Sequence, residues 1–170
     1  MTAATPVPVY VASPLGFSLP TRIFYTRTLL PALAANGLEV LDPWAAPFDD
    51  LSVALAMPPG PGRVRALAAA NTRLADRNRA LLDRCRAVFA VLDGPDVDSG
   101  TAAEIGYAAA LGKPVTGWRS DVRRTGDNDG TVVNLQVQYF VERGGGAVTT
   151  DLGAAIDTLR RTVGLPGGAP

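Results

Sequence analysis

The chain has 170 residues, of which 47 % are hydrophobic, so it is long enough for one domain with a substantial buried core. Sixteen basic and sixteen acidic residues cancel, so the sequence lacks the positive excess that is typical of proteins that bind nucleic acid or anionic membranes. There is no histidine and a single cysteine, Cys85, which excludes a histidine proton shuttle, an internal disulfide and a cysteine-cluster metal site.

Strands and helices alternate along the sequence. Short runs rich in β-branched residues predict buried strands over residues 7–12, 38–41, 87–92 and 114–118, and a short fifth strand over 147–149. Helical periodicity predicts helices over residues 21–36, 63–84, 101–112 and 151–163. Residues 132–142 fit a helix or a strand, and we favour a helix. The Pro-rich and Gly-rich segment 45–62 predicts a loop.

This alternation predicts an α/β fold, a flavodoxin-like doubly wound parallel sheet of four or five strands with helices on both faces. We expect one domain over residues 1–164 and a disordered tail over 165–170. The N-terminus lacks a secretory signal pattern and no apolar run is long enough to span a membrane, so we expect a cytoplasmic protein. In such sheets ligands bind at the carboxyl ends of the strands. The polar residues at or just beyond those ends are Ser13, Asp42, Asp93, Asp98 and Arg119.

One acidic side chain stands out in the segment DGPDVDSGTAAEIGYAAALGK (residues 93–113). Glu104 is the only charged residue between residues 101 and 112, which are helix-forming and otherwise almost wholly apolar. On a helix, Glu104, Ala108 and Leu111 lie on one face, at spacings of four and seven. A lone ionisable group on an apolar face costs free energy to bury, so it indicates chemistry or a binding partner.

A second carboxylate lies six residues earlier. Asp98 or Ser99 can cap the predicted helix, and Gly100 lets the backbone approach a ligand closely. The helix dipole favours an ionised, nucleophilic Glu104, which leaves proton transfer to Asp98. Two carboxylates in different environments are expected where a sugar C–N or C–O bond breaks through an oxocarbenium-like transition state. A structural alternative stays open, in which Glu104 satisfies a backbone group and Asp98 only caps the helix.

The other candidates are weaker. Asn78 lies on the inward face of the long helix, either as a satisfied core amide or as a pocket residue. Tyr10, in the first strand, either packs in the core or brings its hydroxyl to the site. Phe17 and Trp44 follow strands and either pack or stack on a base. We interpret the charges after the fourth strand as a solvated network without function. These charges are Arg119, Asp121, Arg123 and Arg124.

The segment AVFAVLDGPDVDSGTAAEIGYAAALGKPV (residues 87–115) resembles the signature of the nucleoside 2-deoxyribosyltransferase family. The runs VYVASPLGF (9–17), WRSDVRR (118–124) and VVNLQVQYF (132–140) also resemble the family in order and spacing. The resemblance implies transfer of a 2-deoxyribosyl group between nucleobases by a retaining double displacement. It implies neither a metal nor a cofactor, which agrees with the absence of histidine and of clustered cysteine.

The resemblance also implies roles for individual residues. Glu104 would attack C1′ and form a glycosyl-enzyme ester, while Asp98 would bind the base and manage its proton. Tyr10 would lie near the sugar and the nucleophile. Asn134 would reach the sugar 5′-hydroxyl in a neighbouring subunit's site, so a homo-oligomer, a dimer or a hexamer, is expected. The partners would be nucleosides and nucleobases, without nucleic acid or membrane. The substrate-binding residues would be Tyr10, Asn78, Asp93, Gly100 and Asn134.

Three alternatives remain open. Asn78 stands where many family members place an aspartate, which leaves room for a nucleoside-binding domain with little turnover. Some relatives hydrolyse the N-glycosidic bond of nucleosides or of nucleoside 5′-monophosphates, although no arginine precedes Arg22 in the first loop, which disfavours a phosphorylated substrate. The run GTAAE (100–104) also resembles part of the phosphoribohydrolases of the lysine-decarboxylase-like fold. Those enzymes carry a glycine pair where this chain has PDVDS (95–99), so the acidic residues argue against them.

Overall fold

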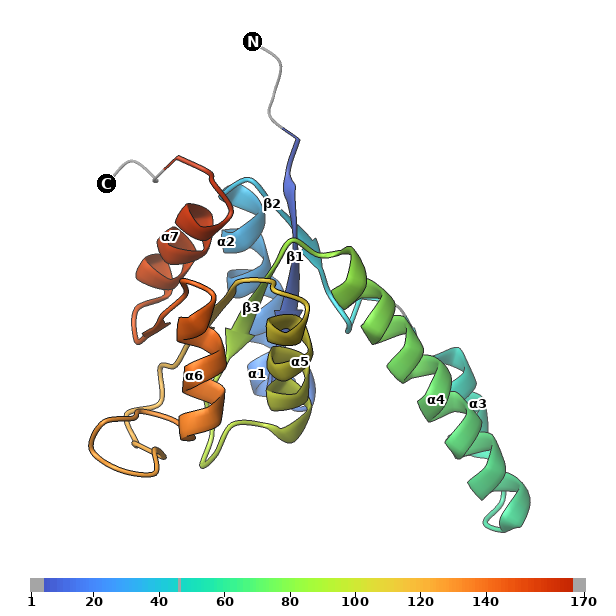
Figure 1. Cartoon of the computed structure of the whole chain (residues 1–170). Helices are drawn as coiled ribbons and strands as arrows, with labels where there is room; N and C mark the ends of the chain where they lie inside the picture. The colour runs from blue at the N-terminus through green and yellow to red at the C-terminus, as the bar shows by residue number, and fades with distance from the viewer. Residues whose placement is uncertain (1–4, 46, 167–170) are drawn as a thin grey trace.

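The computed structural model describes residues 5–45 and 47–166, and within them a five-stranded parallel sheet forms the centre of the molecule (Figure 1). The strand order is β2-β1-β3-β4-β5. The strands are β1 (Val7–Ala12), β2 (Leu38–Leu41), β3 (Ala87–Val91), β4 (Val115–Trp118) and β5 (Val148–Thr149). The predicted doubly wound fold is confirmed. Because the winding direction reverses at β1, the carboxyl ends of β1 and β3 form the edge at which a ligand is expected.

Helices connect the strands and cover both faces of the sheet. They are the short 3-10 turn η1 (Pro14–Gly16), α1 (Leu19–Phe24), the π-helical η2 (Tyr25–Leu29), α2 (Leu30–Ala35), α3 (Asp49–Ala56), α4 (Pro61–Arg84), α5 (Ser99–Ala110), α6 (Leu135–Arg143) and α7 (Leu152–Thr162). Residues 132–142 contain a helix, as favoured. The helix predicted over 21–36 is confirmed as a continuous helical segment made of α1, η2 and α2. Its middle is π-helical, because the Leu30 amide donates to the carbonyl of Tyr25, five residues back, and Pro31 has no amide hydrogen to donate.

The prediction of a structureless loop over residues 45–62 is wrong, because this segment contains α3. Asp49 and Asp50 lie in the first turn of α3, where acidic side chains interact favourably with the helix dipole. Helix α3 packs against α4, and the pair projects from the body as an arm (Figure 1). Only Ala70 and Leu82 of α4 are buried. The turn between the two helices thus lies at residues 57–60, and Pro61 begins α4.

The two faces of the sheet form two separate cores. The first contains Val9, Val11 and Phe89 from the strands, with residues of α2 and α7. The second contains Tyr10 and Ala12 of β1, with residues of α5, α6 and the C-terminal end of α4. Alternate side chains of β1 therefore point to opposite faces, as the period of a strand requires. This alternation directs Tyr10 toward α5, the helix that carries Glu104.

The only lysine fixes the end of α4 that lies against the sheet. The Lys113 ammonium donates to the carbonyls of Leu82 (2.6 Å), Asp83 (2.7 Å) and Cys85 (2.8 Å). A compact ammonium has three donors, which match three convergent carbonyls better than a planar guanidinium would. The side chain thus satisfies carbonyls that a helix end leaves without partners.

The predicted domain over residues 1–164 and the predicted tail over 165–170 lie only partly within the described residues. Leu165, in the segment expected to be disordered, packs against the first core, and its amide donates to the carbonyl of Arg160 (2.9 Å). Residues 167–170 lie outside the described residues, as do residues 1–4. Among the helices of the described part, none is long and apolar enough to cross a membrane.

Candidate active site

Glu104 is held by a hydrogen bond from a tyrosine on the sheet. The Tyr10 hydroxyl donates to Glu104 Oε1 at 2.5 Å, and Tyr10 is fully buried. Glu104 itself is half-buried and forms no ion pair within the described part of the chain. It is therefore neither clamped by an arginine nor turned into bulk water, and its second oxygen is left for another partner.

The surroundings of Glu104 shift its protonation equilibrium. Burial raises the pKa of the carboxyl to about 7, the hydrogen bond from Tyr10 opposes this rise, and the negative charge of Asp98 adds to it. Burial and the neighbouring Glu104 also raise the pKa of the Tyr10 hydroxyl above its usual range, so Tyr10 stays a donor. Near neutral pH a large fraction of Glu104 is an anion that donors stabilise only weakly, which is the state of a competent nucleophile.

Asp98 is the N-cap residue of α5, so the structure decides between the two caps that the sequence left open. Its Oδ2 accepts from the Thr101 amide (2.9 Å) and from the Thr101 hydroxyl (3.2 Å). The other oxygen, Oδ1, has no hydrogen-bond partner among the described residues. Asp98 thus caps the helix with one oxygen while the other remains available to a ligand.

Glu104 and Asp98 line the same cavity, which has a volume of about 310 Å³. The other lining residues are mainly apolar and aromatic, and they include Phe17, Pro43, Trp44, Phe48, Leu51 and Leu74. Gly100, Thr101, Ser13 and Asn78 complete the lining. A cavity that combines an aromatic wall with two carboxylates suits a flat ring joined to a group that a carboxylate can attack.

The aromatic wall is fixed by contacts with the loop after β1. The Trp44 indole donates to the carbonyl of Ser13 (3.1 Å). The Phe17 ring packs edge-on against the indole, with 4.7 Å between the ring centroids. A Cβ on Gly16 would lie 2.2 Å from the indole ring, so glycine is required for this approach. The backbone amide of Trp44 donates to Asp42 Oδ1 (2.8 Å). The ring is therefore held in place before any ligand binds.

A second hollow, of about 410 Å³, also reaches Glu104. It lies between α4 and α5 and shares Asn78, Gly100 and Glu104 with the first cavity. The Asn78 Oδ1 atom is buried and has no hydrogen-bond partner in the structure. A desolvated amide oxygen without a partner costs free energy, so the interpretation of Asn78 as a satisfied core amide is wrong.

Comparison with known proteins places the chain among relatives. The family described as nucleoside 2-deoxyribosyltransferase matches residues 9–136, which is well over half of the chain. The chain belongs to this family. An uncharacterised protein of Schizosaccharomyces pombe is 40 % identical over 82 residues, which are 46 % of this chain and 36 % of the yeast protein. The chain thus spans about a third of the length of this curated relative.

Solved structures share the fold at low sequence identity. A conserved protein from Enterococcus faecalis V583 superposes with a TM-score of 0.65 at 21 % identity, covering 92 % of this chain and 98 % of the other. The 2-deoxyribosyltransferase of Bacillus psychrosaccharolyticus gives 0.63 at 18 % identity, covering 96 % and 100 %. The enzyme of Leishmania mexicana gives 0.55 at 23 % identity, covering 78 % and 85 %. These likenesses establish the deoxyribosyltransferase fold.

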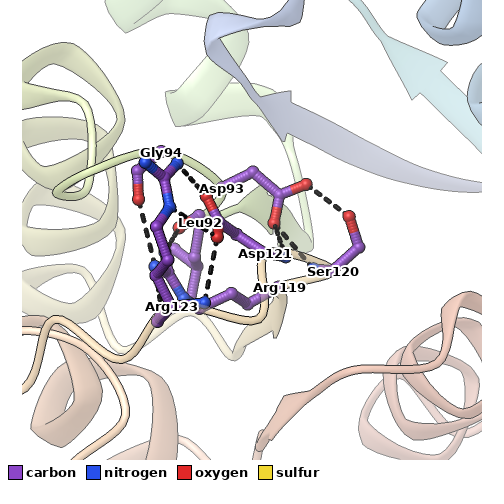
Figure 2. Close-up of polar contacts among 7 residues, drawn as sticks. All are labelled: Leu92, Asp93, Gly94, Arg119, Ser120, Asp121 and Arg123. Carbon is purple, nitrogen blue, oxygen red and sulfur yellow. Dashed lines mark hydrogen bonds and ion pairs between the residues drawn. The ribbon is translucent and has the colours of Figure 1, made fainter.

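The structure does not bring Asp93 into the cavity of this family member. Asp93 Oδ1 accepts from the amides of Ser120 (2.6 Å) and Asp121 (2.8 Å), and Oδ2 accepts from the Ser120 hydroxyl (2.7 Å). Figure 2 shows this carboxylate turned toward the loop after β4. Both oxygens are occupied within the chain. The contacts thus support a role in holding that loop, whereas the sequence had indicated a substrate-binding residue.

The interpretation of Arg119 as part of a solvated network is wrong. Arg119 is fully buried, and its guanidinium donates to the carbonyls of Leu92, Gly94 (3.0 Å) and Arg123 (2.6 Å) (Figure 2). Among these four charges, the described residues contain one ion pair, between the exposed Arg123 and the half-buried Asp121. The buried guanidinium ties the loop after β3, which leads to Asp98, to the loop after β4.

Asn134, the residue expected to serve a neighbouring subunit, lies at the N-cap of α6. Its Oδ1 accepts from the amides of Gln136 (3.0 Å) and Val137 (3.4 Å). It is absent from the linings of the two hollows that contain Glu104. Within one chain, the structure therefore brings together Tyr10, Asn78, Asp98, Gly100 and Glu104, and it leaves Asn134 and Asp93 apart.

Sequence reasoning missed the part of the wall that α3 and its N-cap supply. Phe48 and Leu51 belong to the segment that was expected to be a loop. The acidic pair at 49–50 followed by LSVALA was the signal that could have indicated α3. Within the described ranges, no three His, Cys, Asp or Glu side chains gather in a way that could hold a metal ion.

Proposed function

We propose that this family member transfers a 2-deoxyribosyl group from one nucleobase to another, with Glu104 as the nucleophile. The observation that supports this most is the weakly stabilised carboxylate of Glu104, whose only hydrogen bond within the described residues comes from Tyr10, in a cavity with an aromatic wall. The wall suits the base, and the carboxylate lies where the anomeric carbon of an attached sugar can reach it. Phe17, Trp44 and Phe48 provide the apolar faces on which the base stacks.

The reaction takes two displacements at one carbon. In the first, a Glu104 oxygen attacks C1′, the bond from C1′ to the base nitrogen breaks, and its electron pair leaves with the base. Asp98 gives a proton from its free oxygen to the departing base, which leaves Asp98 as a carboxylate. In the second, a nitrogen of another base attacks C1′, the ester bond breaks, and its electron pair returns to the Glu104 carboxylate. The incoming base loses its proton toward Asp98, so two inversions restore the original anomer.

The remaining residues position these groups. Tyr10 orients Glu104 through its hydrogen bond and does not line the cavity. Gly100 keeps the start of α5 free of a side chain beside both carboxylates. Asn134, at the exposed start of α6, would reach the sugar in a neighbouring copy, so the active protein would be a homo-oligomer. The partners are nucleosides and nucleobases.

Among the alternatives, cleavage of nucleoside 5′-monophosphates is disfavoured by the charges of the site. None of the described residues that line the first cavity is lysine or arginine, whereas Asp98 and Glu104 are acidic. The N-terminus of α5, which otherwise attracts phosphate, is capped by the carboxylate of Asp98. We therefore expect an uncharged nucleoside as the donor.

A base-exchange assay tests the proposal. The protein is incubated with a 2′-deoxynucleoside, with and without a second free base, and the products are separated by chromatography. Formation of the new nucleoside supports the transferase, whereas free sugar alone supports a hydrolase. Reaction of 5′-monophosphates only would favour the monophosphate hydrolase, and binding without any product would favour a nucleoside-binding domain. Oligomeric state in solution, measured by light scattering, tests the role of Asn134: a monomer with full activity would contradict it.

A further inference from the structure

Arg77 of α4 contacts two residues of the cavity lining without being part of that lining itself. Its Nη2 atom donates to the carbonyl of Pro43 at 2.5 Å, and its guanidinium carbon lies 4.8 Å from the centre of the Phe48 ring. Pro43 and Phe48 both line the cavity that contains Glu104. A planar guanidinium can donate a hydrogen bond and lie over an aromatic face at the same time. Arg77 thus joins α4 to the lining at two points.

The Pro43 carbonyl belongs to the peptide group that leads into Trp44. The amide of the same peptide group, which is the amide of Trp44, donates to Asp42 Oδ1 at 2.8 Å. A planar peptide that is held at both its oxygen and its nitrogen has little freedom to rotate. Phe48 in turn packs edge-on against Trp44, with 6.4 Å between the ring centroids. Arg77 therefore acts on both aromatic rings, on Phe48 by direct contact and on Trp44 through its peptide group.

This part of the wall is not held by close packing. A third hollow, of about 300 Å³, is lined in part by Arg77. The side chains that line both this hollow and the cavity that contains Glu104 are Phe48, Leu51 and Leu74. Side chains that line two hollows have fewer neighbours to fix them than side chains in a close-packed core. The position of the wall therefore depends on directed contacts such as those of Arg77.

We propose that Arg77 is a positioning residue that holds the aromatic wall in the arrangement that receives the base, and so sets the affinity for the base without taking part in the reaction at C1′. This inference rests on the proposed function, since it takes a nucleobase as the molecule that stacks on the wall. A wall that is ordered before binding spares the complex the entropic cost of ordering it. The base stacks in the ground state and in the transition state, so loss of this order weakens both equally, which raises KM and leaves kcat unchanged.

Two arginines about one turn apart on α4 provide a variant and its matched control. Arg77→Met keeps a long apolar side chain but removes the charge and the donors. Arg73→Met makes the same change at a residue that lines the same third hollow and pairs with Asp50 at 2.7 Å, an exposed ion pair between α4 and α3. Such a pair lies within the arm and contributes little to stability. We therefore expect Arg73→Met to leave the wall and the affinity for the base unchanged.

Kinetics and binding measure the effect on affinity. For Arg77→Met we expect about a tenfold rise in the KM for a 2′-deoxynucleoside and in the calorimetric dissociation constants of free adenine and free cytosine. The kcat for base exchange should change by less than about twofold. A fall in kcat at an unchanged KM would overturn the proposal, and so would equal effects of Arg77→Met and Arg73→Met.

The order of the wall can also be measured without a ligand. The chain has two tryptophans, and Trp118 lies in the first core, so labelling with fluorotryptophan gives two ¹⁹F NMR signals with Trp118 as the internal reference. We expect the Trp44 signal to broaden or move toward that of free tryptophan in Arg77→Met and to stay in place in Arg73→Met. An unchanged Trp44 signal in Arg77→Met would overturn the proposal. A wild-type chain that neither binds nor exchanges bases would contradict the proposed function, whereas the Trp44 signal would still decide whether Arg77 orders the wall.

Discussion

Two polar groups lie at the same edge of the sheet, one around Asp93 and one around Glu104, and they differ in how fully their hydrogen bonds are satisfied within the chain. Asp93, after β3, receives three hydrogen bonds from the next loop, and Arg119 beside it is buried against three carbonyls. Glu104, one helix away, receives a single hydrogen bond, from Tyr10, and faces a cavity. The first group holds loops together because all its polar atoms but Arg119 Nε have partners. The second group has oxygens left without partners, which a ligand can bind. Whether a polar group's hydrogen bonds are satisfied within the chain, more than whether it is charged, therefore distinguishes a structural role from a candidate functional one.

The largest expected effect tests the reactive side of this comparison. Glu104→Gln keeps the shape of the side chain and removes its charge, so the nucleophile is lost. We expect base exchange to fall by about a thousandfold or more, equivalent to about 4 kcal/mol in the barrier, with the fold unchanged. The measurement is the rate of product formation, with circular dichroism as a check on folding. The control is Glu142→Gln, on the exposed face of α6, which should retain full activity. A loss below tenfold for Glu104→Gln would contradict the nucleophilic role.

The second prediction tests the scaffold side. Arg119→Met fills a similar volume but removes the donors to the carbonyls of Leu92, Gly94 and Arg123. Leaving buried acceptors without partners should lower the free energy of unfolding by about 3 kcal/mol. Urea unfolding followed by circular dichroism measures this loss. Arg65→Met, at an exposed position of α4, is the matched control and should change stability by less than about 0.5 kcal/mol. Equal stabilities of the two variants would show that the buried guanidinium is not structural.

The sequence predicted the helices and strands better than it predicted the hydrogen-bond partners of polar side chains. Alternating apolar runs were sufficient to predict the sheet, and the lone charge in residues 101–112 was sufficient to single out Glu104, which the structure places in the lining of the cavity, because both signals are local. Arg119 was misjudged because its burial depends on carbonyls that lie about 25 residues away in the chain. Asp93 was assigned to the site for the same reason, since its partners follow the next strand. Phe48 and Leu51 were missed because a short helix between Pro-rich segments has weak periodicity.

A third prediction returns to Glu104 and concerns stability. Its pKa in the folded chain, about 7, exceeds the ordinary value of 4.5, so the folded state binds more protons than the unfolded state between these values. Stability therefore falls as pH rises through this range, and above pH 7 the buried charge costs on the order of 2 kcal/mol. Glu104→Gln removes that cost, so it should be more stable than wild type at pH 8 and no more stable at pH 4.5. Urea midpoints at the two pH values check this, and a pH-independent difference would contradict it.

The smallest expected effect isolates the one hydrogen bond that the reactive carboxylate receives. The bond from Tyr10 lowers the pKa of Glu104 against the effects of burial and of Asp98, so Tyr10→Phe should raise that pKa by about one unit. Base exchange should then fall about tenfold at pH 6 and change little at pH 9, because at high pH Glu104 is ionised in both proteins. Tyr25→Phe is the matched control, since its hydroxyl is also buried but donates to Asp42. If both variants moved the acid limb equally, a general loosening of the core would explain the shift. If only Tyr10→Phe moves it, the shift comes from the loss of the one hydrogen bond that Glu104 receives. A second strong donor would lower the nucleophilicity that the reaction requires, so a single donor on the cavity side is what the proposed chemistry favours.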